Sequence, residues 1–207
     1  MQSADLNEED IYNQFSQNLI ETLETDTSPL ELNFEHNCIG DKGITVLCNV
    51  LKCYTNVIKL DLKWDSISNQ GAKTLAETLK VNTSLIEIDL WANQINHKGA
   101  KALAEALKVN TTLEKLTLDY NSIGNKGAKA LAEALKENKT LKKLGLHDSQ
   151  IGDEGVQALI EVLKTNTTLK TLVLGGNLIS HQVTQTLFEA LKTEITLTKL
   201  ALCDNQF

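Results

Sequence analysis

The sequence predicts an α/β solenoid, in which one strand and one helix repeat along a single elongated domain. The eleven residues of Lys98–Lys108 recur, unchanged, as Lys126–Lys136. A Leu-x-x-Leu/Ile-x-Leu-x-x-Asn run precedes each copy and begins at Leu85 and at Leu113. A strand and a helix that recur at one fixed period are typical of solenoid repeats, whose units bury their apolar faces against their neighbours.

The same 28-residue period continues through the rest of the chain without a slip. The first leucine of the unit recurs at Val57, Leu85, Leu113, Leu141, Leu169 and Leu197, and Pro29 holds this place in the first unit. We therefore predict a repeat domain over residues 29–207, made of six full repeats and a final partial repeat.

Within each unit, alternating leucines place one face of a short strand inward. An asparagine such as Asn93 or Asn121 follows the strand, and its amide can satisfy backbone groups where the chain turns. Asp65 and Ser149 stand at this position in two repeats and can make only part of these bonds.

The helices carry apolar residues at the spacing of one buried face, as in Ala100, Leu103, Ala104 and Leu107. The residues expected to cap their N-termini are Ser68, Asn96, Ser180, Gly40, Gly124 and Gly152. A second asparagine follows each helix, where we expect it to adopt the left-handed conformation that ends helices. These asparagines are Asn82, Asn110, Asn138 and Asn166.

Residues 1–28 do not follow the repeat. Ile11, Phe15, Leu19 and Leu23 recur every fourth residue, which predicts one apolar stripe on a helix. The first unit of a solenoid would otherwise expose its core, so we predict an N-terminal helical cap over residues 1–28. A flexible tail and a partner-binding helix are the alternatives.

Charge and composition narrow the classes of function. The net charge is −7, all 20 basic residues are lysine, and ten acidic residues precede Lys42. This distribution argues against nucleic acid as a ligand and favours a basic partner near the N-terminal end. No apolar run reaches the roughly 20 residues of a membrane span, and no secretory signal begins the chain, so we expect a cytoplasmic protein without membrane contact.

The reactive residues do not predict an enzyme, a cofactor or a metal site. The histidines fall at different repeat positions, and the sequence holds no phosphate-binding glycine loop and no nucleophile elbow. Without arginine the chain cannot supply an arginine finger. The four cysteines form no Cys-x-x-Cys pair, which favours free thiols in a reducing compartment. A zinc site of His36, Cys38, Cys48 and Cys53 is the alternative, but its spacing fits no common structural pattern.

The complete 28-residue unit resembles that of leucine-rich repeat proteins of the ribonuclease-inhibitor-like class. That class includes the repeat regions of NOD-like receptors and of the Ran GTPase-activating proteins. The resemblance covers residues 29–207 and implies a horseshoe, with a parallel sheet on the concave face and helices on the convex face. It also implies protein recognition rather than catalysis.

Aromatic residues cluster on the expected concave face, at two outward positions after the third leucine of the unit. Trp64, Trp91, Tyr120 and His147 fall there on consecutive repeats. Binding hot spots favour Trp and Tyr, so we predict that these side chains contact a partner. In the alternative, the rings lie flat on neighbouring strands and only stiffen the sheet. The charged residues expected to rim this surface are Asp61, Lys63, Asp89, Asp119 and Asp148.

The sequence thus predicts a non-enzymatic protein–protein interaction module that binds a partner protein on its concave face. One version is a bacterial or protist effector that acts in the cytosol of a host cell. The alternatives are a regulator of a small GTPase, similar to the Ran GTPase-activating proteins, and a structural fragment of a larger receptor. The last repeat stops at Phe207 without a closing helix. Self-association through the C-terminal edge, a truncated chain, and Phe207 acting as a plug are the three interpretations.

Overall fold

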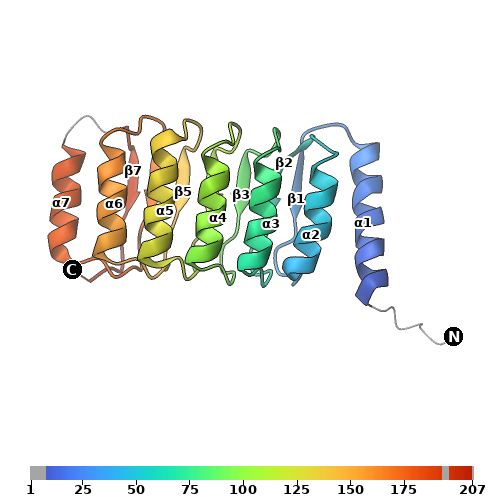
Figure 1. Cartoon of the computed structure of the whole chain (residues 1–207), viewed down its shortest axis with the longest axis horizontal. Coiled ribbons are helices and arrows are strands. Elements are labelled where there is room, and N and C mark those ends of the chain that lie inside the picture. The colour runs from blue at the N-terminus through green and yellow to red at the C-terminus, as the bar shows by residue number, and fades with distance from the viewer. Residues whose placement is uncertain (1–7, 193–195, 207) are drawn as a thin grey trace.

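The structure, a computed structural model, describes residues 8–192 and 196–206, in which helices and strands alternate along the chain (Figure 1). The helices are α1 (Glu8–Thr25), α2 (Gly40–Leu51), α3 (Asn69–Leu79), α4 (His97–Leu107), α5 (Gly124–Glu137), α6 (Asp153–Leu163) and α7 (His181–Leu191). The strands are β1 (Leu30–Asn33), β2 (Val57–Asp61), β3 (Glu87–Asp89), β4 (Lys115–Thr117), β5 (Lys143–Gly145), β6 (Thr171–Val173) and β7 (Lys199–Ala201).

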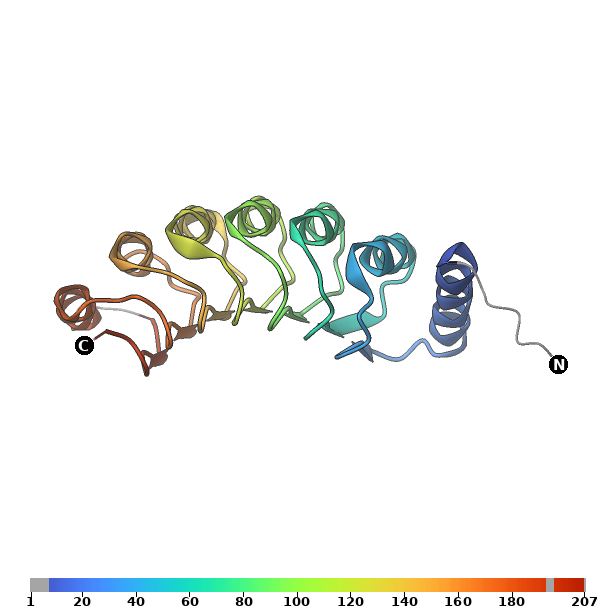
Figure 2. The same cartoon turned by 90° about the horizontal axis from the view of Figure 1, so that it is seen from below.

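All these strands form one parallel sheet in the order of the sequence, β1 to β7. Figure 2 shows the helices along the outer, convex side of an open arc and the strands along its inner, concave side. The central residues of consecutive strands are paired, as Leu60 with Ile88 and Leu116 with Leu144. The predicted α/β solenoid with a concave parallel sheet is therefore confirmed.

The core runs continuously between the sheet and the helices. The inward residues of the central strands, such as Ile88 and Leu116, have no exposed surface, and neither have Leu90 and Leu118, which directly follow β3 and β4. On α4, Ala100 and Leu103 are equally buried, which confirms the face predicted from their spacing. Alanine lets each helix approach the strands closely, while the leucines fill the space between neighbouring repeats.

The asparagines after the strands bond the backbone across repeats, as predicted. The Asn121 Nδ2 donates to the carbonyl oxygens of Leu90 (2.9 Å) and Leu118 (3.2 Å), and its Oδ1 accepts from the Ile95 N–H (2.9 Å). Each side chain thus ties one turn to the preceding repeat and also closes its own turn. We call this row of residues the turn ladder; its members are Asn37, Asp65, Asn93, Asn121, Ser149, Asn177 and Asn205.

Asp65 and Ser149 fill this role only in part, as expected. The Asp65 Oδ1 accepts from the backbone N–H of Asn37 (3.0 Å) and of Ile39 (3.4 Å). Its Oδ2 is buried without a hydrogen-bond partner, because a carboxylate cannot donate as the asparagine amide does. Burial raises the pKa of the Asp65 carboxyl, and the nearby charge of Asp61 raises it further. Ser149 keeps the donor function, through bonds from its Oγ to the carbonyl oxygens of Leu118 and His147.

The expectation for the asparagines after the helices was wrong. None of Asn82, Asn110, Asn138 and Asn166 has a positive φ. They are buried instead and form a second ladder, in which the Asn110 Nδ2 donates to the Leu79 carbonyl (2.8 Å) and its Oδ1 accepts from the Leu113 N–H (2.8 Å). The amide thus satisfies backbone groups of two repeats at once.

The helix starts agree with the prediction at three side-chain caps and differ at two glycines. Ser68, Asn96 and Ser180 each accept a hydrogen bond from a backbone N–H of the first turn. Gly40 and Gly124 lie inside α2 and α5 as first residues, with φ of 55° and 61°. Glycine is suited to this left-handed entry into the helix because it lacks a Cβ.

The helix α1 lies beside α2 at the start of the arc (Figures 1 and 2). Its Leu19 and Leu23 are buried, and the Phe15 ring meets the Phe34 ring edge-on at a centroid distance of 5.6 Å. These contacts are those a cap would make, and the division into a cap and a repeat domain stays a prediction. Within the described residues, no helix has the length and apolar character needed to cross a membrane.

Candidate protein-binding surface

The turn that follows each strand forces one residue of every repeat into the left-handed region. Trp64 and Tyr120 have φ of 58° and 55°. The residues at this position are His36, Trp64, Ala92, Tyr120, Asp148, Gly176 and Asp204, and each has a positive φ. Bulky side chains are uncommon in this region, because the Cβ crowds the backbone. Tryptophan and tyrosine therefore stand where glycine would fit with less strain.

The aromatic side chains of consecutive repeats contact one another along the concave face. The ring centroids are 5.0 Å apart between Trp64 and Trp91, 4.7 Å between Trp91 and Tyr120, and 5.1 Å between Tyr120 and His147. Trp64 is 47% exposed and Tyr120 is 44% exposed, while Trp91 is half-buried between them. The structure thus places the four predicted residues in one continuous line.

His36 extends this line by one repeat, although it was not among the binding residues predicted from the sequence. Its ring stacks on Trp64 with an interplanar angle of 15° and a centroid distance of 5.5 Å. The signal was present, because His36 precedes Trp64 by one 28-residue period. We call the five rings of His36, Trp64, Trp91, Tyr120 and His147 the aromatic ladder.

The charged residues beside the ladder are more constrained than a freely exposed rim. The Lys63 Nζ pairs with Asp61 (2.9 Å) and with Glu35 (3.5 Å). Asp89 accepts a hydrogen bond from the Trp91 N–H (3.0 Å), and Asp119 accepts one from the His147 N–H (2.8 Å). Both aspartates are half-buried, and burial raises the pKa of each carboxyl. Backbone N–H groups of the turns thus hold the carboxylates of Asp89 and Asp119 in place.

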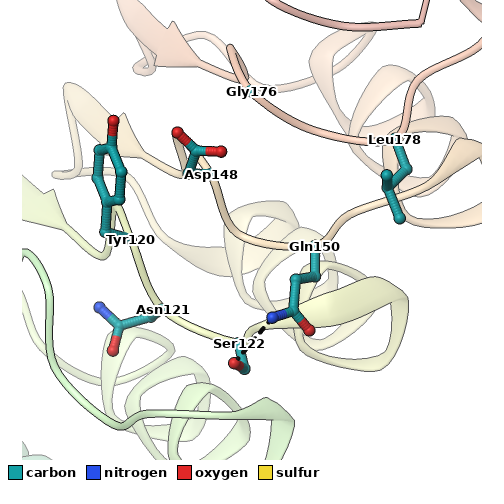
Figure 3. A pocket seen from close by; sticks show the side chains of 7 residues that line it. All are labelled: Tyr120, Asn121, Ser122, Asp148, Gln150, Gly176 and Leu178. Atoms are coloured by element: carbon teal, nitrogen blue, oxygen red, sulfur yellow. Dashed lines mark hydrogen bonds between the residues drawn. The ribbon is translucent and has the colours of Figure 1, made fainter.

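Asp148 joins the last two rings of the ladder. Its Oδ2 lies 3.0 Å from the His147 Nε2, and its carboxylate, by hydrogen bonding to the Tyr120 hydroxyl, raises the pKa of that group. Tyr120 and Asp148 line a hollow of about 380 Å³, and Figure 3 shows the tyrosine and the carboxylate side by side. Ser122 and Gln150 also line this hollow, and the Gln150 Nε2 donates a hydrogen bond of 3.1 Å to the Ser122 Oγ.

Glycines replace large side chains on the concave face toward β7. A Cβ on Gly175 would lie 2.6 Å from the His147 Nδ1, and one on Gly176 would lie 2.6 Å from the Asp148 carboxylate. The glycines therefore leave room for the side chains of the preceding repeat. We call Gly175, Gly176, Cys203 and Asp204 the glycine end.

The cysteines and histidines do not form a metal site in the described part of the chain. Cys48 is buried and the other three cysteines are exposed, all as free thiols. Among the described residues, no three histidine, cysteine or acidic side chains gather as they would around a metal ion. The proposed combination of His36 with three cysteines is not brought together.

The comparisons with known proteins agree with this architecture. Two overlapping spans, residues 60–151 and 122–207, match the family described as the TMOD/LMOD leucine-rich domain, and residues 30–48 match a leucine-rich repeat. No curated protein sequence matches the chain.

Two solved structures share the fold. One is the actin-binding site 2 of leiomodin-1, with 24% identity, a TM-score of 0.59, and coverage of 84% of this chain and 95% of that one. The other is the tropomodulin C-terminal domain of Caenorhabditis elegans, with 22% identity, a TM-score of 0.60, and coverage of 73% and 92%.

These matches identify the protein first as a leucine-rich repeat protein. The two family spans together cover well over half of the chain, and the chain therefore belongs to the family of TMOD/LMOD leucine-rich domains.

Proposed function

We propose that this protein is a non-enzymatic protein-binding module and that its aromatic ladder contacts the partner. The ribonuclease-inhibitor-like subclass of the repeat is part of this proposal. The mechanism is recognition by a preformed surface, whose rings already contact their neighbours. Such a surface loses little side-chain entropy on binding, so more of the contact energy is available for affinity.

The observation that carries the proposal is the choice of residues at the strained turn position. Trp64 and Tyr120 are nearly half exposed at positive φ, while Ala92 and Gly176 form the same turn in other repeats. The fold therefore does not require a large ring there. Strained residues with exposed aromatic surface are found at binding sites, where contact with a partner favours them.

Actin is the first partner to test, because one relative of the same fold is described as an actin-binding site. The experiment is a pull-down from lysate with mass spectrometry, together with co-sedimentation with filamentous actin. Wild type is compared with the Trp64→Ala/Trp91→Ala variant. We expect this variant to lose the wild-type partner, by roughly 30-fold or more in affinity, as hot-spot residues do.

The matched control replaces Lys101 and Glu105, which are exposed on the outer face of α4, with alanine. It should keep the partner at the wild-type yield. Capture of the same proteins at the same yield by the Trp64→Ala/Trp91→Ala variant would overturn the proposed surface, provided that the variant unfolds at the wild-type denaturant concentration.

The alternative of a small-GTPase regulator is separated by a GTP hydrolysis assay. We expect the purified protein not to stimulate hydrolysis, since the chain has no arginine to offer to the phosphates. Stimulated turnover would support the regulator instead. Pull-downs from the producing cell and from a candidate host cell distinguish a resident cytoplasmic protein from a bacterial or protist effector.

Self-association is a separate part of the proposal. Leu178 and Phe188, which belong to the last described repeats, are each 53% exposed. If this end pairs two copies, sedimentation should give a dimer for wild type and a monomer for Phe188→Asp. A wild-type monomer at high concentration would exclude self-association through this end.

A further inference from the structure

A hollow of about 400 Å³ lies beside the aromatic ladder on the concave face. Its lining includes the rings of Trp64 and Trp91 and the carboxylates of Asp89 and Asp119. Aromatic faces and carboxylates are the two kinds of group that attract a lysine or arginine side chain. The hollow therefore has the chemistry of a site for a cation that arrives with its hydrocarbon stem.

The two carboxylates carry negative charge that the protein itself neutralises poorly. Each uses one oxygen for a backbone N–H, of Trp91 in one case and of His147 in the other. Neither forms an ion pair with another described residue, although burial already penalises their charged forms. A cation bound between them would offset that penalty.

The lysines of this hollow do not cancel its negative charge. Lys63 is already shared between Asp61 and Glu35, at 2.9 Å and 3.5 Å. Burial raises the pKa of Asp119 and outweighs the nearby charges of His147 and Lys143, which lower it; Lys143 also lines the hollow. The two ammonium groups are thus outnumbered by four carboxylates, those of Glu35, Asp61, Asp89 and Asp119. Asp148 adds another negative charge beside Tyr120.

We infer that the concave face binds an extended, lysine- or arginine-rich segment of a partner protein, with one basic side chain seated between the tryptophan rings and the carboxylates of Asp89 and Asp119. This inference rests on the proposed function and names the chemistry of the partner. The five rings follow consecutive strands, which are roughly 4.8 Å apart, so the ladder spans about 20 Å. About six residues of extended chain cover that length.

The test uses the intrinsic fluorescence of the protein, because Trp64 and Trp91 are its only tryptophans and both line the hollow. The full chain is titrated with hexa-arginine, and hexaglutamate of the same length is the control peptide. We expect a saturable change in tryptophan emission with hexa-arginine, weakened by added salt, and none with hexaglutamate.

The matched variants separate a specific site from general attraction to an acidic protein. Asp89→Asn/Asp119→Asn keeps both side-chain oxygens that accept backbone hydrogen bonds. Glu105→Gln/Glu133→Gln removes the same charge from the outer faces of α4 and α5, where both glutamates are exposed. We expect the first pair to weaken hexa-arginine binding by about tenfold or more and the second pair to change it less than about twofold.

Equal binding of hexa-arginine by the two double variants, or equal binding of the two peptides by wild type, overturns the inference. The proposed function is tested separately, by partner capture. If capture depends on Trp64 and Trp91 but not on Asp89 and Asp119, the surface binds its partner without a basic side chain and the inference fails alone. If capture depends on neither pair, the proposed function fails as well.

Discussion

The two ends of the concave face share one scaffold but carry different surfaces. Asn121 and Asn177 make the same set of bonds, to carbonyl oxygens of the preceding repeat and of their own turn. Leu118 and Leu174 are equally buried. Yet the aromatic ladder covers one end, while Gly175 and Gly176 open the other. The scaffold can be built without the rings, and their presence therefore requires a reason other than folding.

The largest effect is expected when an asparagine of the turn ladder is removed, and comparing this loss of unfolding free energy at the two ends tests whether they share the same scaffold. Asn121→Ala and Asn177→Ala each leave several buried backbone groups without partners, so each should lower the free energy of unfolding by about 3 kcal/mol. Urea unfolding followed by circular dichroism measures this loss. A cost at one end less than half of that at the other would show that the two ends differ in their scaffold as well.

The next effect concerns Asp65, which departs from asparagine at the ladder end. The folded protein raises the pKa of this carboxyl, so it favours the protonated form. That stability is complete below the pKa of the unfolded chain and is lost as the pH rises through the folded pKa. Asp65→Asn cannot titrate and restores the missing donor. We expect it to raise the free energy of unfolding by about 2 kcal/mol at pH 7 and by little at pH 3.

The control for this prediction is Ser149→Asn, which also completes the turn ladder but removes no titratable group. Its effect on the free energy of unfolding should be the same at both pH values. If Asp65→Asn raised the free energy of unfolding equally at both pH values, protonation of Asp65 would not relieve the cost of its buried Oδ2, and the prediction would be wrong.

Smaller effects separate backbone strain from ring contacts at the turn position. Gly176→Ala adds a Cβ at positive φ, 2.6 Å from the Asp148 carboxylate, and should cost about 1–2 kcal/mol. Ala92→Gly relieves the strain alone and should add about 1 kcal/mol. Tyr120→Gly relieves strain but loses its ring contacts, so its unfolding free energy should stay within about 1 kcal/mol of wild type. Thermal unfolding should therefore rank Ala92→Gly as the most stable of the three variants and Gly176→Ala as the least stable. A large loss of stability for Tyr120→Gly would contradict this order and would indicate that the Tyr120 ring only stiffens the sheet.

The repeat allowed much of the fold to be predicted, because each position of the unit has one physical task. The inward leucines, the concave sheet and the neighbouring positions of Trp64 and Trp91 follow from counting residues in steps of 28. The role of Asn121 followed from the donors and acceptors of its side chain. These features depend on local geometry that every repeat copies.

Contacts between repeats were harder to predict. The Asn69 Oδ1 accepts hydrogen bonds from the backbone N–H groups of Asn96 and of Gly99 at the start of the next helix (both 2.9 Å). Both bonds join neighbouring repeats, so the sequence of a single unit does not predict them. The row of Asn110 was misassigned for the same reason, since its partner carbonyl belongs to another repeat. The half-buried state of Asp89 and Asp119 likewise depends on the side chains of neighbouring strands.

The most direct measurement of the central claim compares partner affinity at the two ends of the concave face. Trp64→Ala and Tyr120→Ala are measured against Cys203→Ala, an exposed residue of the glycine end, by calorimetry with the captured partner. Each change in the aromatic ladder should cost about 2 kcal/mol of binding free energy, and Cys203→Ala should cost almost none. Equal affinities for all three variants would contradict the claim that the ladder, rather than the shared scaffold, binds the partner.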